Sequence, residues 1–174
     1  MPTFGPDRAS CEILTFKEGL LSSVAHDLLL RITRFELTVA ETPPSVRAWF
    51  ESASLEVVAA MRGGRPAPGV LREPDLKEIQ RTALSEVLQA SRYPRVTFAS
   101  TSVKARADGY EVQGELTLCG TARAISFVVR RSGAGLAAEV PLRQPDFGIR
   151  PYTAMLGALK VKPEVVIRLS VPAP

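Results

Sequence analysis

The chain has 174 residues, of which 45% are hydrophobic and 23% are charged. These values suit one soluble globular domain with its own core, and they argue against two domains or a disordered chain. The formal net charge of +4 comes from 22 Lys and Arg against 18 Asp and Glu. Since no run of four or more basic residues occurs, we do not expect a nucleic-acid-binding protein.

The sequence contains no segment that is typical of export or membrane anchoring. Residues 1–16 lack a basic stretch followed by an apolar one, so no signal peptide is expected. No apolar run reaches about 18 residues, the length that a membrane-spanning helix needs. We therefore expect a cytoplasmic protein. Cys11 and Cys119 are then expected to be free thiols, and a disulfide between them is the alternative.

Alternating apolar and polar residues predict strands in the first third of the chain. Cys11 to Lys17 alternates in this way. The run from Val24 to Val39 is long, and its apolar residues change face, which predicts a bend or bulge near Arg34. A third strand is predicted from Arg47 to Met61. The glycine- and proline-rich residues 63–69 then form a linker that cannot join a sheet.

One helix is predicted, from Pro74 to Ala90. Asp75 suits the cap of its first turn, and Glu78 three residues later completes a capping box. The helix is amphipathic, so it lies on the sheet or across a barrel end, either as a lid over a pocket or as a plug that completes the core. Its apolar residues are Leu76, Ile79, Ala83, Leu84, Val87 and Leu88.

Three antiparallel strands in a row are predicted between residues 93 and 131. A turn at Ala107–Gly109 separates the first from the second. In the second strand, Gly114 stands where a side chain is expected, which predicts a bend or the close approach of another group. The apolar face of this strand comprises Tyr110, Val112, Gly114, Leu116 and Leu118.

Two further strands are predicted near the C terminus, at Leu136–Leu142 and Val161–Val171. Residues 149–160 between them are expected to be a loop or a short helical turn. The total is about eight strands. Antiparallel strands at this spacing favour a mainly β fold, an antiparallel β-barrel with one amphipathic helix, and a β-sandwich is the alternative.

The central strands also carry a family resemblance. YPRVTFAST at 93–101 and GELTLCGTARAISF at 114–127 resemble the YceI-like family, and LTFKEGLLSSVAHDLLLRI at 14–32 and DFGI at 146–149 resemble it more weakly. The resemblance covers most of the chain. It implies a single domain over residues 1–174 with an extended lipocalin-like β-barrel, which holds a long amphiphile such as a polyisoprenoid.

The sequence carries no pattern that is typical of catalysis or metal binding. His26 is the only histidine, and no glycine-rich phosphate loop or nucleophile motif occurs. His26 and Asp27 are adjacent on a predicted strand, so their side chains point to opposite faces and do not form a catalytic dyad. We expect no enzyme, no metal and no cofactor. His26 is either a polar contact in the lumen or a structural histidine.

Two functional hypotheses follow. In the favoured one, the barrel lumen binds an isoprenoid or fatty-acyl amphiphile for carriage, storage or sensing. In the alternative, the lumen is filled by side chains, and a structural or interaction protein acts through a surface contact or as a homodimer.

The candidate ligand-binding residues come from the more apolar face of each predicted strand. The ligand is expected to be held mainly by apolar burial, with a few polar anchors at one end of the lumen. The wall candidates are Phe16, Leu28, Leu30, Trp49, Phe98, Tyr110, Val112, Leu116 and Phe127. The polar candidates at the mouth are His26, Arg31 and Tyr152.

Overall fold

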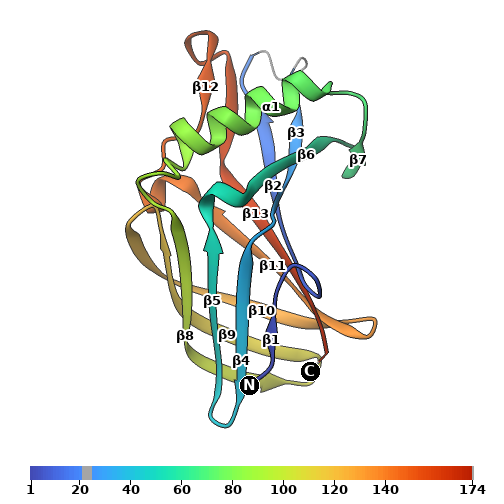
Figure 1. The fold of residues 1–174 in the computed structure, drawn as a ribbon, viewed down its shortest axis with the longest axis vertical. Coiled ribbons are helices and arrows are strands. Elements are labelled where there is room, and N and C mark those ends of the chain that lie inside the picture. Colours follow the sequence, from blue (N-terminus) through green and yellow to red (C-terminus); the bar gives the residue numbers. More distant parts are fainter. Residues whose placement is uncertain (21–24, 174) are drawn as a thin grey trace.

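A single antiparallel sheet forms most of the protein. The computed structural model describes residues 1–20 and 25–173. In this part of the chain, 13 strands curl into a barrel-like wall, and one helix lies across its upper end (Figure 1). Both chain termini lie at the opposite end of the molecule (Figure 1). The predicted mainly β fold, an antiparallel barrel with one helix, is confirmed.

The elements have the following bounds. The strands are β1 (Thr3–Phe4), β2 (Ser10–Glu18), β3 (Asp27–Ile32), β4 (Phe35–Glu41), β5 (Pro44–Glu51), β6 (Leu55–Arg62), β7 (Arg65–Ala67), β8 (Arg95–Arg106), β9 (Gly109–Leu118), β10 (Thr121–Ser132), β11 (Gly135–Arg143), β12 (Thr153–Ala154) and β13 (Leu159–Pro172). The helix α1 spans Glu73–Thr82, a π-helical turn spans Ala83–Val87, and 3₁₀ turns span Ser52–Ser54, Gln144–Phe147 and Met155–Gly157.

Among the described residues, strand pairing forms one curled sheet with two ends, and the chain itself links these ends. The strand order is β1-β4-β5-β8-β9-β10-β11-β13-β2-β3-β6-β7, and β12 pairs with β13. β3 leads directly into β4, and β5 leads into β6 through a 3₁₀ turn, yet the members of each pair stand near opposite ends of this order. The chain therefore links the two ends of the sheet, which leaves only short strands at its edges.

Two of the predicted strands are each broken in two. The bend predicted near Arg34 is confirmed, since residues 33–34 separate β3 from β4. Val24, where that strand was predicted to start, lies outside the described residues. The prediction of one continuous strand from Arg47 to Met61 is wrong, because the 3₁₀ turn Ser52–Ser54 divides it. These two breaks and three strands of two or three residues account for the difference from the predicted eight. One of the three, β7, pairs with β6, so the prediction that residues 63–69 cannot join a sheet is wrong.

The predicted helix is present but differs at both ends. It begins one residue earlier, at Glu73, and it changes from α to π geometry after Thr82. Asp75 was predicted to be the cap but occupies the third helical position. Its carboxylate accepts a hydrogen bond from the backbone N–H of Arg72 at 3.1 Å, which satisfies a donor that the helix leaves unpaired. Glu78 instead pairs with Arg81.

The other predicted strands are confirmed. β8, β9 and β10 form the central meander, and residues 107–108 make the turn between the first two. β11 and β13 correspond to the two C-terminal strands. Residues 149–160 include the short strand β12 and a 3₁₀ turn, so this region combines the loop and the helical turn that were expected.

Two buried serines hold the junction where the long strands bend. Ser52 and Ser54 are 3% and 8% exposed. The Ser54 hydroxyl accepts a hydrogen bond from the Arg34 N–H at 3.0 Å and donates one to the Glu51 carbonyl at 2.8 Å. The Ser52 hydroxyl donates to the Tyr93 carbonyl at 2.7 Å. Side chains thus satisfy backbone groups that the interrupted ladder leaves unpaired.

Gly114 lies where β8 comes closest to β9. A Cβ atom at this position would stand 2.5 Å from the Ala99 carbonyl oxygen and 2.5 Å from Cζ of Phe98. The pairing of the two strands is irregular at the same level, between Ser100 and Ser102. The predicted close approach is therefore confirmed, and the approaching groups are the Phe98 ring and the Ala99 carbonyl.

Replacement of Ser54 by Ala is expected to lower the free energy of unfolding by about 1–3 kcal/mol, because the two hydrogen bonds of its hydroxyl, from the Arg34 N–H and to the Glu51 carbonyl, are lost at about 0.5–1.5 kcal/mol each. Urea unfolding measures the loss. Ser126→Ala, at an exposed position of β10, is the control and is expected to change stability by less than about 0.5 kcal/mol. Equal stability of the two variants would contradict this role for Ser54.

Gly114→Ala is expected to destabilise the protein by about 1–3 kcal/mol, because the added methyl group overlaps a backbone carbonyl that cannot move without shifting β8. Urea unfolding again gives the value. The matched control is Ala124→Val on the outer face of β10, which adds more volume at an exposed position. The explanation fails if the Gly114 variant is as stable as this control.

Candidate ligand-binding cavity

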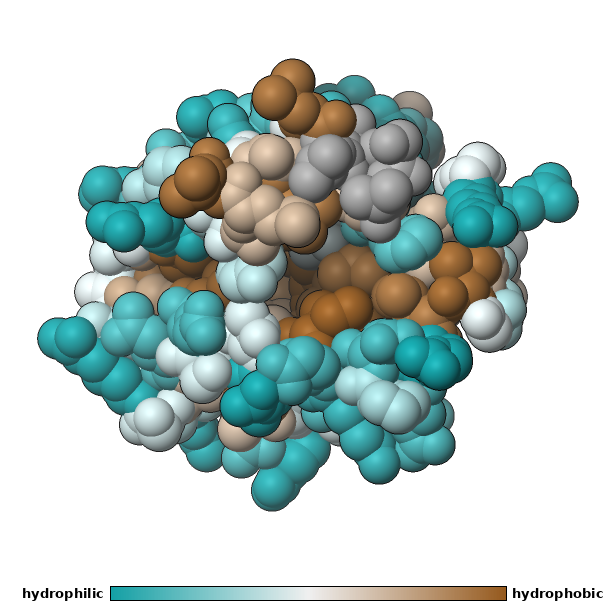
Figure 2. Space-filling view, turned by 90° about the horizontal axis from the view of Figure 1, so that it is seen from above, coloured by the Kyte–Doolittle hydropathy of each residue, from teal (hydrophilic) through white to brown (hydrophobic). Residues whose placement is uncertain are grey.

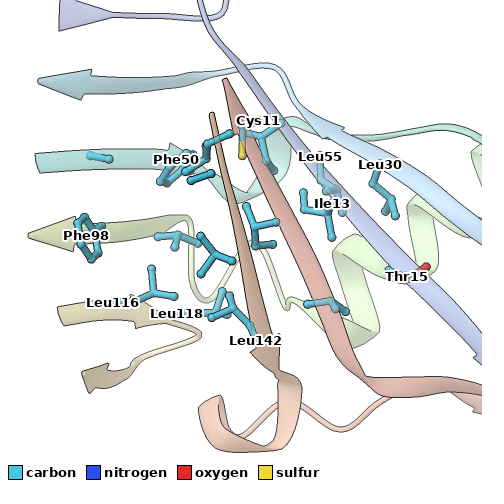
Figure 3. A pocket seen from close by; sticks show the side chains of 18 of the residues that line it. Cys11, Ile13, Thr15, Leu30, Phe50, Leu55, Phe98, Leu116, Leu118 and Leu142 are labelled. Carbon is cyan, nitrogen blue, oxygen red and sulfur yellow. The ribbon is translucent and has the colours of Figure 1, made fainter. Parts of the chain in front are cut away.

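A cavity of about 780 Å³ lies inside the curled sheet. Aliphatic and aromatic side chains make up most of its lining, and they come from strands on all sides and from α1. Figure 3 shows Cys11, Ile13 and Thr15 of β2 pointing into the same space as Leu30 of β3 and Phe98 of β8. The strand period of two places these alternate residues on the inner face.

The inner face borders open space. On β13, Val165, Ile167, Leu169 and Val171 line the cavity, yet each is only half-buried. In a packed core such side chains would be fully covered by the opposite wall. The hypothesis of a structural protein required a lumen filled by side chains, and the cavity contradicts that premise.

The helical segment forms part of the cavity wall. Ile79, Ala83 and Val87 line the cavity from above. Gln80 fixes the helix to β6, since its side-chain oxygen accepts a hydrogen bond from the Val57 N–H at 3.1 Å. The segment covers one side of the cavity without filling it, which favours the lid over the plug.

The mouth of the cavity lies at the end that carries the helix. Figure 2 shows a hollow with a hydrophobic floor, and hydrophilic side chains border much of its opening. Lys17 and Lys160, which lie on neighbouring strands, line the cavity at this end together with His26, Glu78 and Tyr152. The mouth therefore combines an apolar interior with several polar and charged groups.

The other end of the lumen lies by the turn between β4 and β5. Glu41, Pro44 and Ser45 line the cavity there. The Val46 N–H donates a hydrogen bond to the Ser100 hydroxyl at 2.8 Å, which joins β5 to β8 at this level. The lumen thus runs along the barrel from the helix to this turn.

Nine of the predicted residues line the cavity. On β9 and β10, every residue predicted to face the lumen lies on the inner face. The ring centroids of Phe98 on β8 and Phe127 on β10 lie 5.7 Å apart. Whether these residues contact a ligand stays a prediction. They are Leu28, Leu30, Phe98, Tyr110, Val112, Leu116 and Phe127 on the wall, with His26 and Tyr152 at the mouth.

Phe16 and Trp49 are corrections, because neither lines the cavity. The inward residues of β2 are the odd-numbered ones, so Phe16 lies on the outer face. On β5 the inward residues are even-numbered, and Phe50 lines the cavity in place of Trp49. The guanidinium carbon of Arg95 lies 4.5 Å from the centre of the Trp49 ring, a cation–π contact on the outer surface.

Arg31 is a third correction, since it lies on the outer face of β3 and not at the mouth. It stands directly opposite Glu12 of β2 and Glu56 of β6. Glu12 in turn lies 3.6 Å from Arg168 of β13. Arg31 thus belongs to a row of alternating charges that crosses the outside of the sheet, where opposite charges on neighbouring strands stabilise the pairing.

Several lining residues were not predicted. Most of them follow the alternation of the strand or helix that carries them, so the phase of each element was the signal that could have identified them. Phe50 was missed because β5 and β6 were treated as one strand. The main omissions are Cys11, Ile13, Lys17, Phe50, Ile79, Lys160, Val165, Ile167 and Leu169.

Both cysteines are free thiols, and they differ in their surroundings. Cys11 lines the cavity, and its burial, followed by the nearby charge of Glu12, raises the pKa of its thiol to about 12. Burial also raises the pKa of Cys119, whose Sγ donates a hydrogen bond to the Leu88 carbonyl at 3.4 Å. Neither thiol is therefore activated as a nucleophile.

Within residues 1–20 and 25–173, no three His, Cys, Asp or Glu side chains are grouped in a way that would hold a metal ion. No helix in the same ranges has the length and apolar character needed to cross a membrane.

Sequence comparison relates the chain to one protein family. The model of the YceI-like domain matches residues 30–173. Over 93 residues the chain is 31% identical to the protein YceI of Salmonella arizonae and to that of Salmonella paratyphi B. The match covers 48% of this chain and 47% of each relative, so the chain matches about half the length of these relatives.

Solved structures share the fold at low sequence identity. BcnA of Burkholderia cenocepacia is 17% identical, with a TM-score of 0.65 over 95% of this chain and 96% of BcnA. A polyisoprenoid binding domain from Saccharophagus degradans is 12% identical, with a TM-score of 0.58 over 95% and 94% of the two chains. These likenesses show the fold, and the domain match over residues 30–173 shows that the chain belongs to the YceI-like family.

Proposed function

We propose that this protein binds a long-chain amphiphile, an isoprenoid or fatty-acyl lipid, in the lumen of its barrel, for carriage, storage or sensing. The observation that carries the proposal is the apolar cavity of about 780 Å³, which falls within the range of roughly 300–1,000 Å³ for small-molecule sites. The neighbour named as a polyisoprenoid binding domain supports the class of ligand. The role is binding and not catalysis, since aliphatic and aromatic side chains dominate the lining.

The distribution of charge supports one orientation of the ligand. Lys17, Lys160 and His26 lie at the mouth, where the charge of Glu78 is paired with Arg81, whereas Glu41 lies at the other end of the lining. The walls between them are apolar. We infer that the hydrocarbon chain lies along the lumen and that the polar head group stays at the mouth, near Tyr152.

Apolar burial is sufficient to supply the affinity. Each buried CH₂ group contributes about 0.8 kcal/mol, so a chain of about ten carbons gains about 8 kcal/mol before the costs of association. This corresponds to a dissociation constant in the micromolar range, and longer chains offset those costs. Chain length is therefore expected to determine affinity more than the head group does.

The test of the proposal is organic extraction of the protein purified from its native host, followed by mass spectrometry of the extract. A stoichiometric long-chain amphiphile would support the proposal. An extract without one, from protein that also fails to bind added fatty acids or prenyl alcohols, would overturn it.

A series of fatty acids and prenyl alcohols is expected to bind more tightly as the chain lengthens, by about fourfold per CH₂ until the lumen is filled. Val129 lines the cavity, so Val129→Trp should remove room for about two CH₂ groups and weaken a long-chain probe roughly tenfold. Isothermal titration or displacement of a fluorescent fatty acid measures both effects.

The matched control is Val128→Trp, the same substitution one residue earlier. Val128 lies on the outer face, opposite Glu111, so its affinity for the probe should stay within about twofold of the parent. Affinity that tracks head-group charge and ignores chain length would contradict lumen binding. So would equal affinities of the two tryptophan variants.

Cys11 should react slowly with alkylating reagents, because its raised pKa keeps the thiol protonated at pH 8, and the thiolate forms only as the pH approaches about 12. A bound apolar probe should slow the reaction further, since Cys11 lines the cavity. Cys119 lies outside that lining and is the internal control, whose rate should not change with the probe. Mass spectrometry of the two labelled peptides gives both rates, and equal protection of both cysteines would exclude lumen binding.

Two further parts of the proposal come from the sequence. We place the protein in the cytoplasm, where its two free thiols suit a reducing environment, and we consider a homodimer as its assembly. Cell fractionation and sedimentation equilibrium test these two points.

A further inference from the structure

Two loop tips beside the mouth expose large apolar side chains. Leu20 follows the end of β2 and is 92% exposed, while Met155 and Leu156, between β12 and β13, are 68% and 109% exposed. Among the described residues, the other exposed large hydrophobic side chains are those of Met1 and Tyr152, and Tyr152 also lines the cavity. Apart from Met1 at the chain terminus, exposed large apolar side chains therefore gather at one end of the barrel.

The two tips lie against each other. A Cβ atom on Gly19 would stand 2.6 Å from the carbonyl oxygen of Ala158, so the backbones of the two loops are in contact. Just below, Glu18 of β2 pairs with Lys160 of β13. Figure 2 shows hydrophobic atoms that project beside the opening of the cavity. Leu20 and Leu156 thus belong to one apolar rim, which we define as Leu20, Met155 and Leu156.

The backbone of the rim is strained. Met155 and Leu156 have φ values of +52° and +56°, a left-handed conformation that residues other than glycine rarely adopt. Strain of this kind persists where the surrounding structure or a function requires it. Since the Leu156 side chain is fully exposed, packing against the described residues does not offset the strain. The conformation holds two apolar side chains out beside the mouth.

Basic residues flank the rim along the chain. Residues 150–162 include Arg150, Lys160 and Lys162 and contain no Asp or Glu. None of these three side chains forms an ion pair with any residue in the part of the chain that the structure describes. Glu18 stands opposite Lys160 in the sheet, and Glu164, two residues after Lys162 on β13, pairs with Arg143. Apolar tips flanked by free cationic groups are suited to the interface of a bilayer with anionic lipids.

From these observations we propose that the mouth docks on an anionic lipid bilayer. Leu20, Met155 and Leu156 enter the boundary between head groups and acyl chains, and Arg150 and Lys162 contact the lipid head groups. The mouth then faces the lipid, so an amphiphile passes between bilayer and lumen without crossing water. The docking rests on the proposed function for the nature of this cargo, but the contact with the bilayer can be measured separately.

The experiment is co-sedimentation of the full chain with vesicles in which about a third of the phosphatidylcholine is replaced by phosphatidylglycerol. The parent protein is expected to sediment with these vesicles, and less with phosphatidylcholine alone or at high salt. Leu156→Asp is expected to lower the bound-to-free ratio by about tenfold or more. Leu156 is exposed and does not line the cavity, so the far-UV circular dichroism spectrum and the affinity for a soluble fluorescent fatty acid should not change.

Matched controls place the same chemical changes at the opposite end of the barrel. Ala134→Asp adds the same charge at the exposed turn between β10 and β11 and should not affect sedimentation. The double variant Arg150→Glu/Lys162→Glu should lose binding to the anionic vesicles. Lys104→Glu/Arg131→Glu makes the same change in net charge near the turn between β8 and β9 and should retain most of it.

The outcomes separate the docking from the proposed function. Docking is overturned if the parent does not sediment with anionic vesicles, or if the control variants lose as much binding as those at the rim. If the parent binds the fluorescent fatty acid in the absence of vesicles but does not sediment with them, docking fails and lumen binding stands. If it sediments through the rim but binds no fatty acid, docking stands and the proposed function fails.

Discussion

The fold depends on the hydrogen-bonded junction at which the chain bends from β3 into β4 and from β5 into β6. Strands that bend this sharply interrupt their own ladder, and each interruption leaves backbone groups that need other partners. The Ser54 carbonyl accepts hydrogen bonds from the N–H and the hydroxyl of Thr33, at 3.2 and 3.1 Å, while the Ser54 hydroxyl serves Arg34 and Glu51. Because these groups are satisfied, the chain can cross from the β3–β6 pair at one end of the sheet to the β4–β5 pair at the other. The sheet can then curl around a lumen.

The same junction decides which side chains face the lumen. A period of two predicts the inner face only along an unbroken strand, and the 3₁₀ turn shifts the phase between β5 and β6. Trp49 and Leu55 share a face in a continuous strand, but in the protein Phe50 and Leu55 line the cavity. The signal for the break was present in the sequence, as two serines within an otherwise strand-like run. Along the unbroken β9, alternation placed Tyr110 and its neighbours correctly.

Two other predictions are out of phase with the strands that carry them. Phe16 was predicted on the more apolar face of its strand, but the inner face of β2 consists of the odd-numbered residues, which include Cys11, Ile13 and Thr15. Arg31 was placed at the mouth although it is out of phase with Leu30, a lining residue. Alternation also cannot predict whether the lumen is open. That depends on whether side chains from strands far apart in the sequence reach one another, which is a property of the closed sheet.

The open lumen links stability to binding. Lining atoms that face a cavity lack the dispersion contacts that the opposite wall would provide in a filled core, and this lowers the stability of the fold. In the β8–β10 meander, part of these lost dispersion contacts is replaced, because the Phe98 ring packs on Gly114 and lies against Phe127. A chain that enters the lumen restores contacts to residues such as Ile167 and binds only the folded state, so it raises the free energy of unfolding by mass action. Occupancy of the lumen and stability of the barrel therefore depend on the same inward-facing side chains.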